Sequence, residues 1–133
     1  MSQENVEMVK AFFSAYNARD ANACDRLFDP HAEVTTVSTR GGLPGVDWGR
    51  GESSRYFEAL DEAWADLRIE IEDYRGLDDS VLAIGWVRAT GKSSGVQVEE
   101  PFAVLFVIRD SVFVRVDSYS DPSKALEAAR LSE

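Results

Sequence analysis

The order of hydrophobic patterns along the chain predicts an α+β domain. Apolar residues recur every three or four positions over 3–18 and 52–66, which is typical of helices. From residue 67 apolar and charged residues alternate instead, and over 81–109 most positions are apolar, as in strands. Helices gathered before a block of antiparallel strands indicate a sheet covered by helices on one face.

Composition indicates a single soluble domain spanning residues 1–133. The chain has 24 acidic and 14 basic residues, a net charge of −10, and 44% hydrophobic residues. This acidity opposes nucleic-acid binding, and we expect a cytoplasmic protein that does not enter a membrane, because neither a signal peptide nor a long apolar run is evident. One cysteine, Cys24, and one histidine, His31, leave too few ligands for zinc, so neither a metal nor a cofactor is expected.

Local signals place the helix ends. Ser2 is a suitable N-cap for the first helix, and Asp20 can cap a second helix that runs to Phe28. Asp29-Pro30 should end that helix, because proline disfavours a helical residue before it. The third helix is predicted over 52–66, and Asp121-Pro122 should begin the last one.

Strands are predicted on either side of a glycine-rich loop at 39–51. That loop matches neither the phosphate-binding nor the dinucleotide-binding glycine pattern, so we expect it only to bend the chain. Ser93-Ser94-Gly95 should form a hairpin turn. The predicted strands are 31–38, 67–72, 81–90, 101–109 and 112–120.

Two of these strands, 81–90 and 101–109, are apolar on both faces. An antiparallel sheet with one solvated face should alternate instead, so something must cover the second face. In a single domain the simplest cover is another copy of the chain. We therefore predict a homodimer formed through the outer face of the sheet.

Several segments together resemble a known family. They are MSQENVEMVKAFFSAYNARD, LFDPHAEV, GRGESSRYFEAL, GKSSGVQVEEPFAVLFVIRDSVFVRVDSYSD and DPSKALEAARL. The chain is similar to the nuclear transport factor 2-like superfamily and, within it, to SnoaL-like proteins of unassigned function. The resemblance implies a strongly curved antiparallel sheet that wraps the N-terminal helices into a cone, a cystatin-like roll, with an apolar pocket inside. It also implies dimerisation through the outer face.

The resemblance allows the site residues of three related groups to be compared with this chain, and it disfavours the isomerase mechanism. Ketosteroid isomerases place a tyrosine, an acid and an aspartate where this chain has Phe12, Phe106 and Thr36, none of which can replace them. Limonene epoxide hydrolases flank an arginine, matched by Arg88, with two aspartates that would fall near Thr90 and Ser118. The polyketide cyclases of the SnoaL group use an acid on the last strand, where Ser118 should point inward and Asp117 outward. A slip of the alignment by one residue would exchange these two faces.

The predicted function is binding of a small, largely apolar molecule inside the cone, with cofactor-free isomerisation, cyclisation or hydrolysis as the possible chemistry. Arg88 either anchors an anionic ligand group from the inner face or forms an ion pair with Glu99 or Glu100. The alternative function is a dimeric interaction scaffold with a filled interior. The residues expected to line the pocket are Phe12, Tyr16, Thr36, Trp48, Phe57, Trp64, Trp86, Arg88, Phe102, Phe106 and Ser118.

Overall fold

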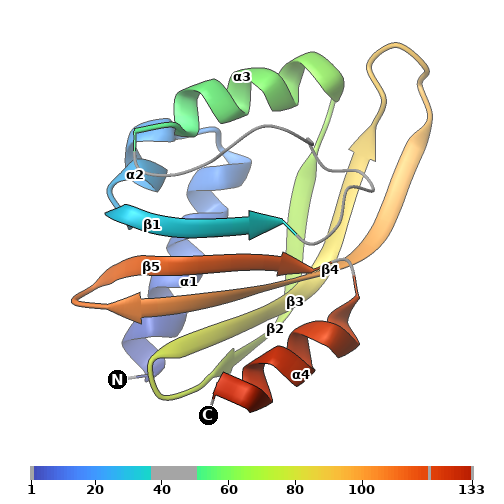
Figure 1. Ribbon diagram of the computed structural model, residues 1–133. Coiled ribbons are helices and arrows are strands. Elements are labelled where there is room, and N and C mark those ends of the chain that lie inside the picture. The colour runs from blue at the N-terminus through green and yellow to red at the C-terminus, as the bar shows by residue number, and fades with distance from the viewer. Residues whose placement is uncertain (1, 37–50, 120, 133) are drawn as a thin grey trace.

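A computed structural model, which describes residues 2–36, 51–119 and 121–132, confirms the α+β class (Figure 1). One sheet of five strands has the order β1-β5-β4-β3-β2. Helix α1 lies behind this sheet in the view of Figure 1, α3 lies above it, and α4 lies on its front face. The helices are α1 (Ser2–Asn17), α2 (Ala21–Asp25), α3 (Ser53–Ala63) and α4 (Pro122–Ser132), and the strands are β1 (Phe28–Thr36), β2 (Arg68–Gly76), β3 (Ser80–Thr90), β4 (Gln97–Arg109) and β5 (Val112–Tyr119).

The inner face of the sheet, which faces α1, holds the larger hydrophobic core. Strand alternation brings Val81, Ala83, Val104 and Phe106 to this face, where they are buried with the apolar side of α1. Asp25, the last residue of α2, holds the start of α3 beside α2, because its Oδ1 accepts a hydrogen bond from the backbone N–H of Ser53 at 3.1 Å. The apolar side of α1 and the apolar inner face of the sheet thus bury each other in one core.

The outer face carries a second, smaller core under α4. Leu82, Ala103 and Leu105 point to this side and are buried against Ala125 and Ala129 of the last helix. The second apolar face noted in the sequence is therefore covered in part by the chain's own C-terminal helix. The strand pattern by itself does not require a second copy of the chain.

The first strand differs from the predicted all-antiparallel arrangement. β1 pairs with β5 in parallel, whereas the other three pairings are antiparallel.

The second helix is shorter than predicted and ends at Asp25, because Phe28 and Pro30 already belong to β1. Pro30 is tolerated because the pairing of β1 with β5 is interrupted between Phe28 and Glu33.

A bulge in β2 marks the place where the sheet bends. The register between β2 and β3 shifts between Ile71 and Asp73, opposite Gly85. A Cβ atom on Gly85 would lie 1.9 Å from the carbonyl oxygen of Glu70, so only glycine permits the two backbones to approach this closely. Beyond this point β3 and β4 continue as a long hairpin past the end of β5 (Figure 1).

Among the described helices, none has both the length and the apolar character that crossing a membrane requires.

Candidate functional site

The inner face of the sheet changes character along its length. At one end, which we call the closed end, the rings of Phe12, Phe28, Phe106 and Phe113 pack edge to face or tilted, with centroids 4.8–5.9 Å apart. All four rings are buried. Such an aromatic cluster is a filled core with little room for a ligand.

The other end of the inner face lies along the β3–β4 hairpin, and its side chains are only partly buried. We call it the open end and define it by Trp64, Val87, Val98, Glu100 and Phe102. Strand register places Val87 opposite Glu100 and Gly85 opposite Phe102, and both Val87 and Phe102 also contact the inner core. The open end is therefore continuous with the core but remains accessible.

Two tyrosines lie where α1 and α3 meet above the inner face. Tyr16 is 4% exposed, and its ring centroid is 6.3 Å from that of Tyr56 and 5.4 Å from that of Phe57. Burial raises the pKa of Tyr16 well above 10.0, and a hydrogen bond to the hydroxyl of Tyr56 adds to the shift. Both hydroxyls therefore stay protonated at neutral pH and form a hydrogen-bonded pair in the interior.

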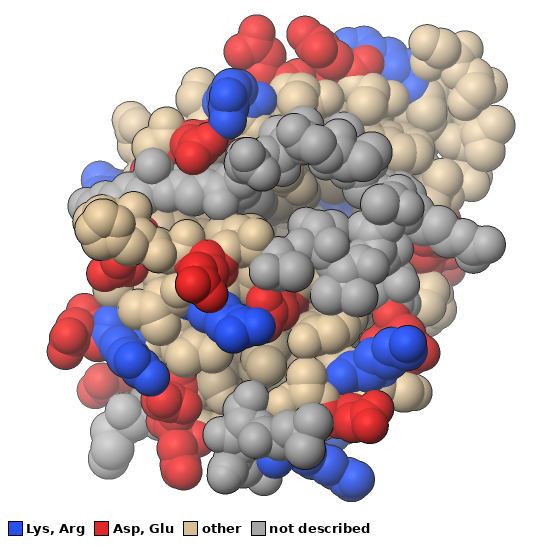
Figure 2. Space-filling view, viewed as in Figure 1, with Lys and Arg blue, Asp and Glu red and all other residues tan. Residues whose placement is uncertain are grey.

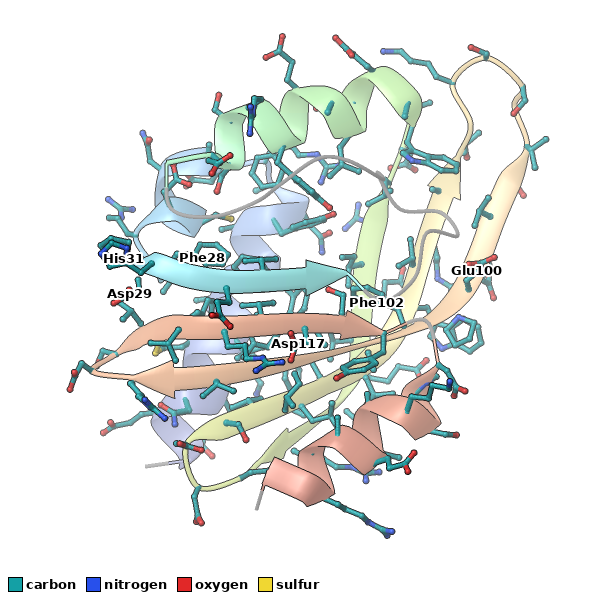
Figure 3. All side chains as sticks on the ribbon, in the orientation of Figure 1. Phe28, Asp29, His31, Glu100, Phe102 and Asp117 are labelled. Carbon is teal, nitrogen blue, oxygen red and sulfur yellow. The ribbon has the colours of Figure 1, made fainter. Side chains whose placement is uncertain are left out.

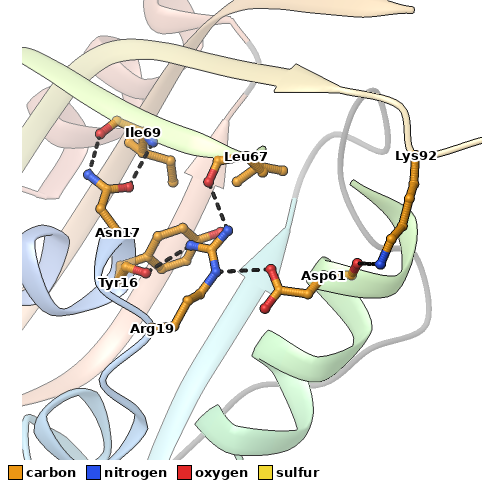
Figure 4. Close-up of polar contacts among 7 residues, drawn as sticks. All are labelled: Tyr16, Asn17, Arg19, Asp61, Leu67, Ile69 and Lys92. Carbon is orange, nitrogen blue, oxygen red and sulfur yellow. Dashed lines mark hydrogen bonds and ion pairs between the residues drawn. The ribbon is translucent and has the colours of Figure 1, made fainter. Parts of the chain in front are cut away.

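Arg19 and Asn17, at the end of α1, fix the position of this tyrosine pair (Figure 4). The guanidinium of Arg19 donates to the carbonyl oxygens of Tyr16 at 2.9 Å and Leu67 at 2.8 Å, and to Asp61 Oδ1 at 3.2 Å. It also lies over the ring of Tyr16, 5.5 Å from the centroid. These contacts join α1, α3 and the start of β2.

Asn17 attaches the same helix end to the edge strand β2. Its Nδ2 donates to the carbonyl oxygen of Ile69 at 2.9 Å, and its Oδ1 accepts from the N–H of Ile69 at 3.0 Å (Figure 4). The amide side chain thus replaces a neighbouring strand at the sheet edge. It thereby attaches the end of α1 to Ile69, which begins the row of residues Ile69, Val87 and Glu100 across the sheet.

Trp64 provides an unusual donor at the open end. It follows the last residue of α3, pairs with Gly91 through a β-bridge and packs against the inner core. Its indole Nε1 is buried, and within the described part of the chain it has no hydrogen-bond partner. A buried N–H without an acceptor is unfavourable by about 1–3 kcal/mol, so this atom is a natural contact for an acceptor on a ligand.

Two neighbouring acids on β4 have opposite surroundings. Glu99 lies on the outer face opposite Arg88 and accepts a hydrogen bond from its Nη1. Arg88 Nε also donates to Glu70 at 2.9 Å. Glu100 lies on the inner face, half-buried, on the same strand as Phe102 (Figure 3). Sequence reasoning considered Glu100 only as a partner of Arg88, and strand register is the signal that separates the two acids.

The structure distributes the predicted pocket residues over three environments. Those buried in the inner core are Phe12, Tyr16, Phe57 and Phe106. Trp64 and Phe102 are partly buried at the open end, and Ser118 lies on the inner face opposite Val104. As predicted, Asp117 points to the other side of β5 (Figure 3), where Arg115 Nε donates to its Oδ2 at 2.9 Å.

Arg88 and Trp86 are the residues that sequence reasoning placed on the wrong face. Both alternate with the inner residues Val87 and Ala89 and therefore lie outside, where Arg88 forms ion pairs with Glu70 and Glu99. Of the two roles considered for Arg88, the structure therefore supports the ion pair, and the side chain does not point toward the interior. Trp48 lies outside the described residues, and for Thr36 the structure describes only the backbone, paired with Ser118.

A metal centre is not built by the described residues. Within the ranges that the structure describes, no three His, Cys, Asp or Glu side chains are grouped for a metal ion. The cysteine is also unsuited to nucleophilic work, because burial raises the pKa of the Cys24 thiol to about 12, and Asp25 and Asp20 add to the shift. What the described residues offer on the inner face is apolar surface, a tyrosine pair, an indole N–H and the carboxylate of Glu100.

The curved sheet around α1, with a partly open inner face, defines a cystatin-like α+β cone. A family model for the SnoaL-like domain matches residues 9–116, so the chain belongs to the SnoaL-like family. No protein of curated function matches the chain.

Solved structures confirm the same fold. A nuclear transport factor 2-like protein of unknown function from Burkholderia pseudomallei is 16% identical, with a TM-score of 0.75 over 92% of this chain and 95% of that one. TerC, crystallised with polyporic acid, is 18% identical, with a TM-score of 0.75 over 92% and 95%. A protein of ketosteroid isomerase-like fold from Catenulispora acidiphila, in complex with trimethylamine, is 19% identical, with a TM-score of 0.73 over 91% and 90%.

Proposed function

We propose that this protein binds a small, largely apolar molecule at the open end of its cone. The molecule lies on the inner face of the β3–β4 hairpin, against Val87 and Phe102, and extends toward the tyrosine pair at the end of α1. Largely apolar sites with a few converging polar groups are the usual form of small-molecule sites. The closed end, filled by its own rings, forms the floor.

The observation that carries this proposal is the indole N–H of Trp64. It is buried on the inner side without an acceptor among the described residues, while apolar side chains surround it. A ligand carbonyl would supply the missing acceptor and remove the penalty for the unpaired donor. The ligand class that fits is therefore an aromatic or alicyclic compound with a carbonyl group.

The chemistry available at this site is cofactor-free. The hydroxyls of Tyr16 and Tyr56 share a hydrogen bond, and such a pair can polarise a ligand carbonyl while remaining protonated. Isomerisation, cyclisation and hydrolysis are reactions that use this kind of polarisation. Arg88 takes no part, because it is paired on the outer face.

Two proteins of the same fold support the idea of a small-molecule site. TerC was crystallised with polyporic acid, and the Catenulispora acidiphila protein was solved in complex with trimethylamine. The fold is thus compatible with small organic ligands.

The first experiment is native mass spectrometry of freshly purified protein, followed by solvent extraction of any retained compound. It is followed by calorimetric titration with acetylnaphthalene and with isopropenylnaphthalene, which has the same shape but lacks the carbonyl oxygen. We expect the ketone to bind about fivefold to tenfold more tightly, as one hydrogen bond to a buried donor allows.

Two matched variants assign this preference to one atom. Trp64→Phe removes the N–H at the open end, and Trp86→Phe makes the same change on the outer face. The preference for the ketone should disappear only in Trp64→Phe. Equal effects of the two changes would refute the site, and a wild-type protein that binds neither probe would favour the alternative, an interaction scaffold.

We also propose a homodimer formed through the outer face of the sheet. It is supported by Trp86, a large aromatic residue that the small outer core leaves partly exposed. Acidic and basic side chains are interspersed over the face in Figure 2, so such an interface would contain charged residues of both signs beside its apolar ones. Light scattering should give twice the monomer mass, and Trp86→Glu should return the monomer.

A further inference from the structure

Glu100 is a carboxylate for which the described part of the chain offers no polar partner. It lies on the inner face, because it stands opposite Val87 in a ladder that runs without a bulge from Ser80 to Thr90. Within residues 2–36, 51–119 and 121–132 it forms neither a hydrogen bond nor an ion pair. Its neighbour Glu99, by contrast, is paired with Arg88 on the outer face.

The surroundings of Glu100 are apolar and aromatic. Phe102 lies two residues further along the same face, and Val87 lies directly across on β3. Both side chains also contact the inner core. A half-buried carboxylate next to apolar groups is poorly solvated, so it favours a partner that is positively charged.

The row of residues across the sheet relates Glu100 to the other polar groups. Asn17 holds Ile69, Ile69 pairs with Val87, and Val87 pairs with Glu100. Neighbouring strands are about 4.8 Å apart, and β4 is two strands away from β2, to which Asn17 attaches the end of α1. Glu100 is therefore roughly 10 Å from β2. A molecule of the size of a substituted naphthalene has this length.

From these contacts we propose that the ligand of the open end carries a protonated amine, which binds Glu100 while its apolar body lies along the inner face. The ring of Phe102 reinforces the choice of a cation, because the face of an aromatic ring attracts an ammonium group. This inference rests on the proposed function and adds a charge to its ligand class. The site then selects an amino ketone over a neutral ketone of the same shape.

The experiment compares two probes that differ only at one end. One is acetylnaphthalene with an aminomethyl group on the far ring, and the other has a hydroxymethyl group in the same place. Calorimetric titration of the full chain should show that the amine binds about tenfold more tightly than the alcohol at low salt, and that added salt reduces this ratio.

The matched variants are Glu100→Gln and Glu99→Gln, which remove the same charge from neighbouring positions on opposite faces. Glu100→Gln should abolish the preference for the amine, and a circular dichroism spectrum that matches the wild-type chain shows that the variant is folded. Glu99→Gln should keep the preference, because Arg88 retains Glu70 as a partner. This comparison removes the general attraction of an acidic protein for cations.

The possible outcomes distinguish a failure of the amine inference from a failure of the proposed function. If the alcohol binds in a Trp64-dependent way and the amine binds no more tightly, the amine inference is wrong and the proposed function stands. If both glutamine variants reduce the preference equally, the effect comes from net charge and Glu100 is not the site. If neither probe binds the wild-type chain, the proposed function fails and the inference fails with it.

Discussion

The two ends of the inner face are made by the same strands and yet are packed differently. At the closed end, Val81 and Ala83 of β3 face Phe106 and Val104 of β4, and all four are buried. Six residues further along the same two strands, Val87 faces Glu100 and both are only partly buried. The pairing of β4 with β5 stops at Ala103, so the open end is formed where β3 and β4 extend past β5.

The polar groups follow the same division. The closed end is apolar, whereas the open end adds the buried N–H of Trp64 and the carboxylate of Glu100. Polar groups without partners among the described residues are unfavourable for folding, so their presence at the open end supports the binding role that we propose for it. Stability and ligand binding should therefore respond to mutations at different ends.

The largest expected effect is at the closed end. Phe106→Ala removes a fully buried ring that contacts Phe12 and Phe113, and should lower the free energy of unfolding by roughly 3–5 kcal/mol. Phe102→Ala, the same change at the open end, should cost less than about 2 kcal/mol because its ring is partly exposed. Urea unfolding measures both, and equal losses would contradict the division into two ends.

A smaller effect is expected where α1 attaches to the edge strand. Asn17→Ala leaves the N–H and carbonyl groups of Ile69 without their partner and should cost about 1–2 kcal/mol. In the same variant the backbone amide of Ile69 should exchange its hydrogen faster, because it has lost its acceptor on Asn17. Asn22→Ala on the exposed side of α2 serves as the control and should change stability by less than about 0.5 kcal/mol.

The tyrosine pair should make stability sensitive to alkaline pH. Burial raises the pKa of Tyr16 well above 10.0, so the folded state keeps a proton that the unfolded state loses. The free energy of unfolding is then unaffected by this group below pH 10.0 and falls above it, by about 1.4 kcal/mol per pH unit.

Tyr16→Phe should make this alkaline decline shallower in urea titrations. The remaining decline comes from other buried groups, including Cys24, whose pKa burial raises to about 12. A slope identical to that of the wild-type chain above pH 10.0 would show that Tyr16 ionises freely in the folded state.

The smallest effect is expected on the outer face. Arg88→Leu breaks the ion pairs with Glu70 and Glu99 near the open end, but these groups are exposed and contribute little to stability. Ketone binding should not change, because Arg88 points away from the inner face. A marked loss of affinity would show that the outer face communicates with the site.

Much of the inner face could be predicted from the sequence, although the polar groups of the open end could not. The rows of aromatic residues on α1, α3 and β4 identified Phe12, Tyr16, Phe57 and Phe106 as inward-facing, because helical and strand periods determine which residues share a face. Side chains alternate between the two faces of a strand, so a wrong choice of the inner face at Arg88 also reverses the assignment of its neighbours. The correct choice depends on the pairing register, which the sequence does not give. That is why Arg88 was expected inside and Glu100 was not.

What the amino-acid sequence determined by itself is the order of elements, the two-sided apolar character of β3 and β4, and the family. These depend on local periodicity and composition, which short segments already contain. The tertiary structure alone decided that α4 covers part of the outer face, that β1 runs parallel to β5, and that Glu99 and Glu100 face opposite environments. Those results depend on contacts between residues far apart in the chain, and such contacts exist only once the sheet has closed around α1.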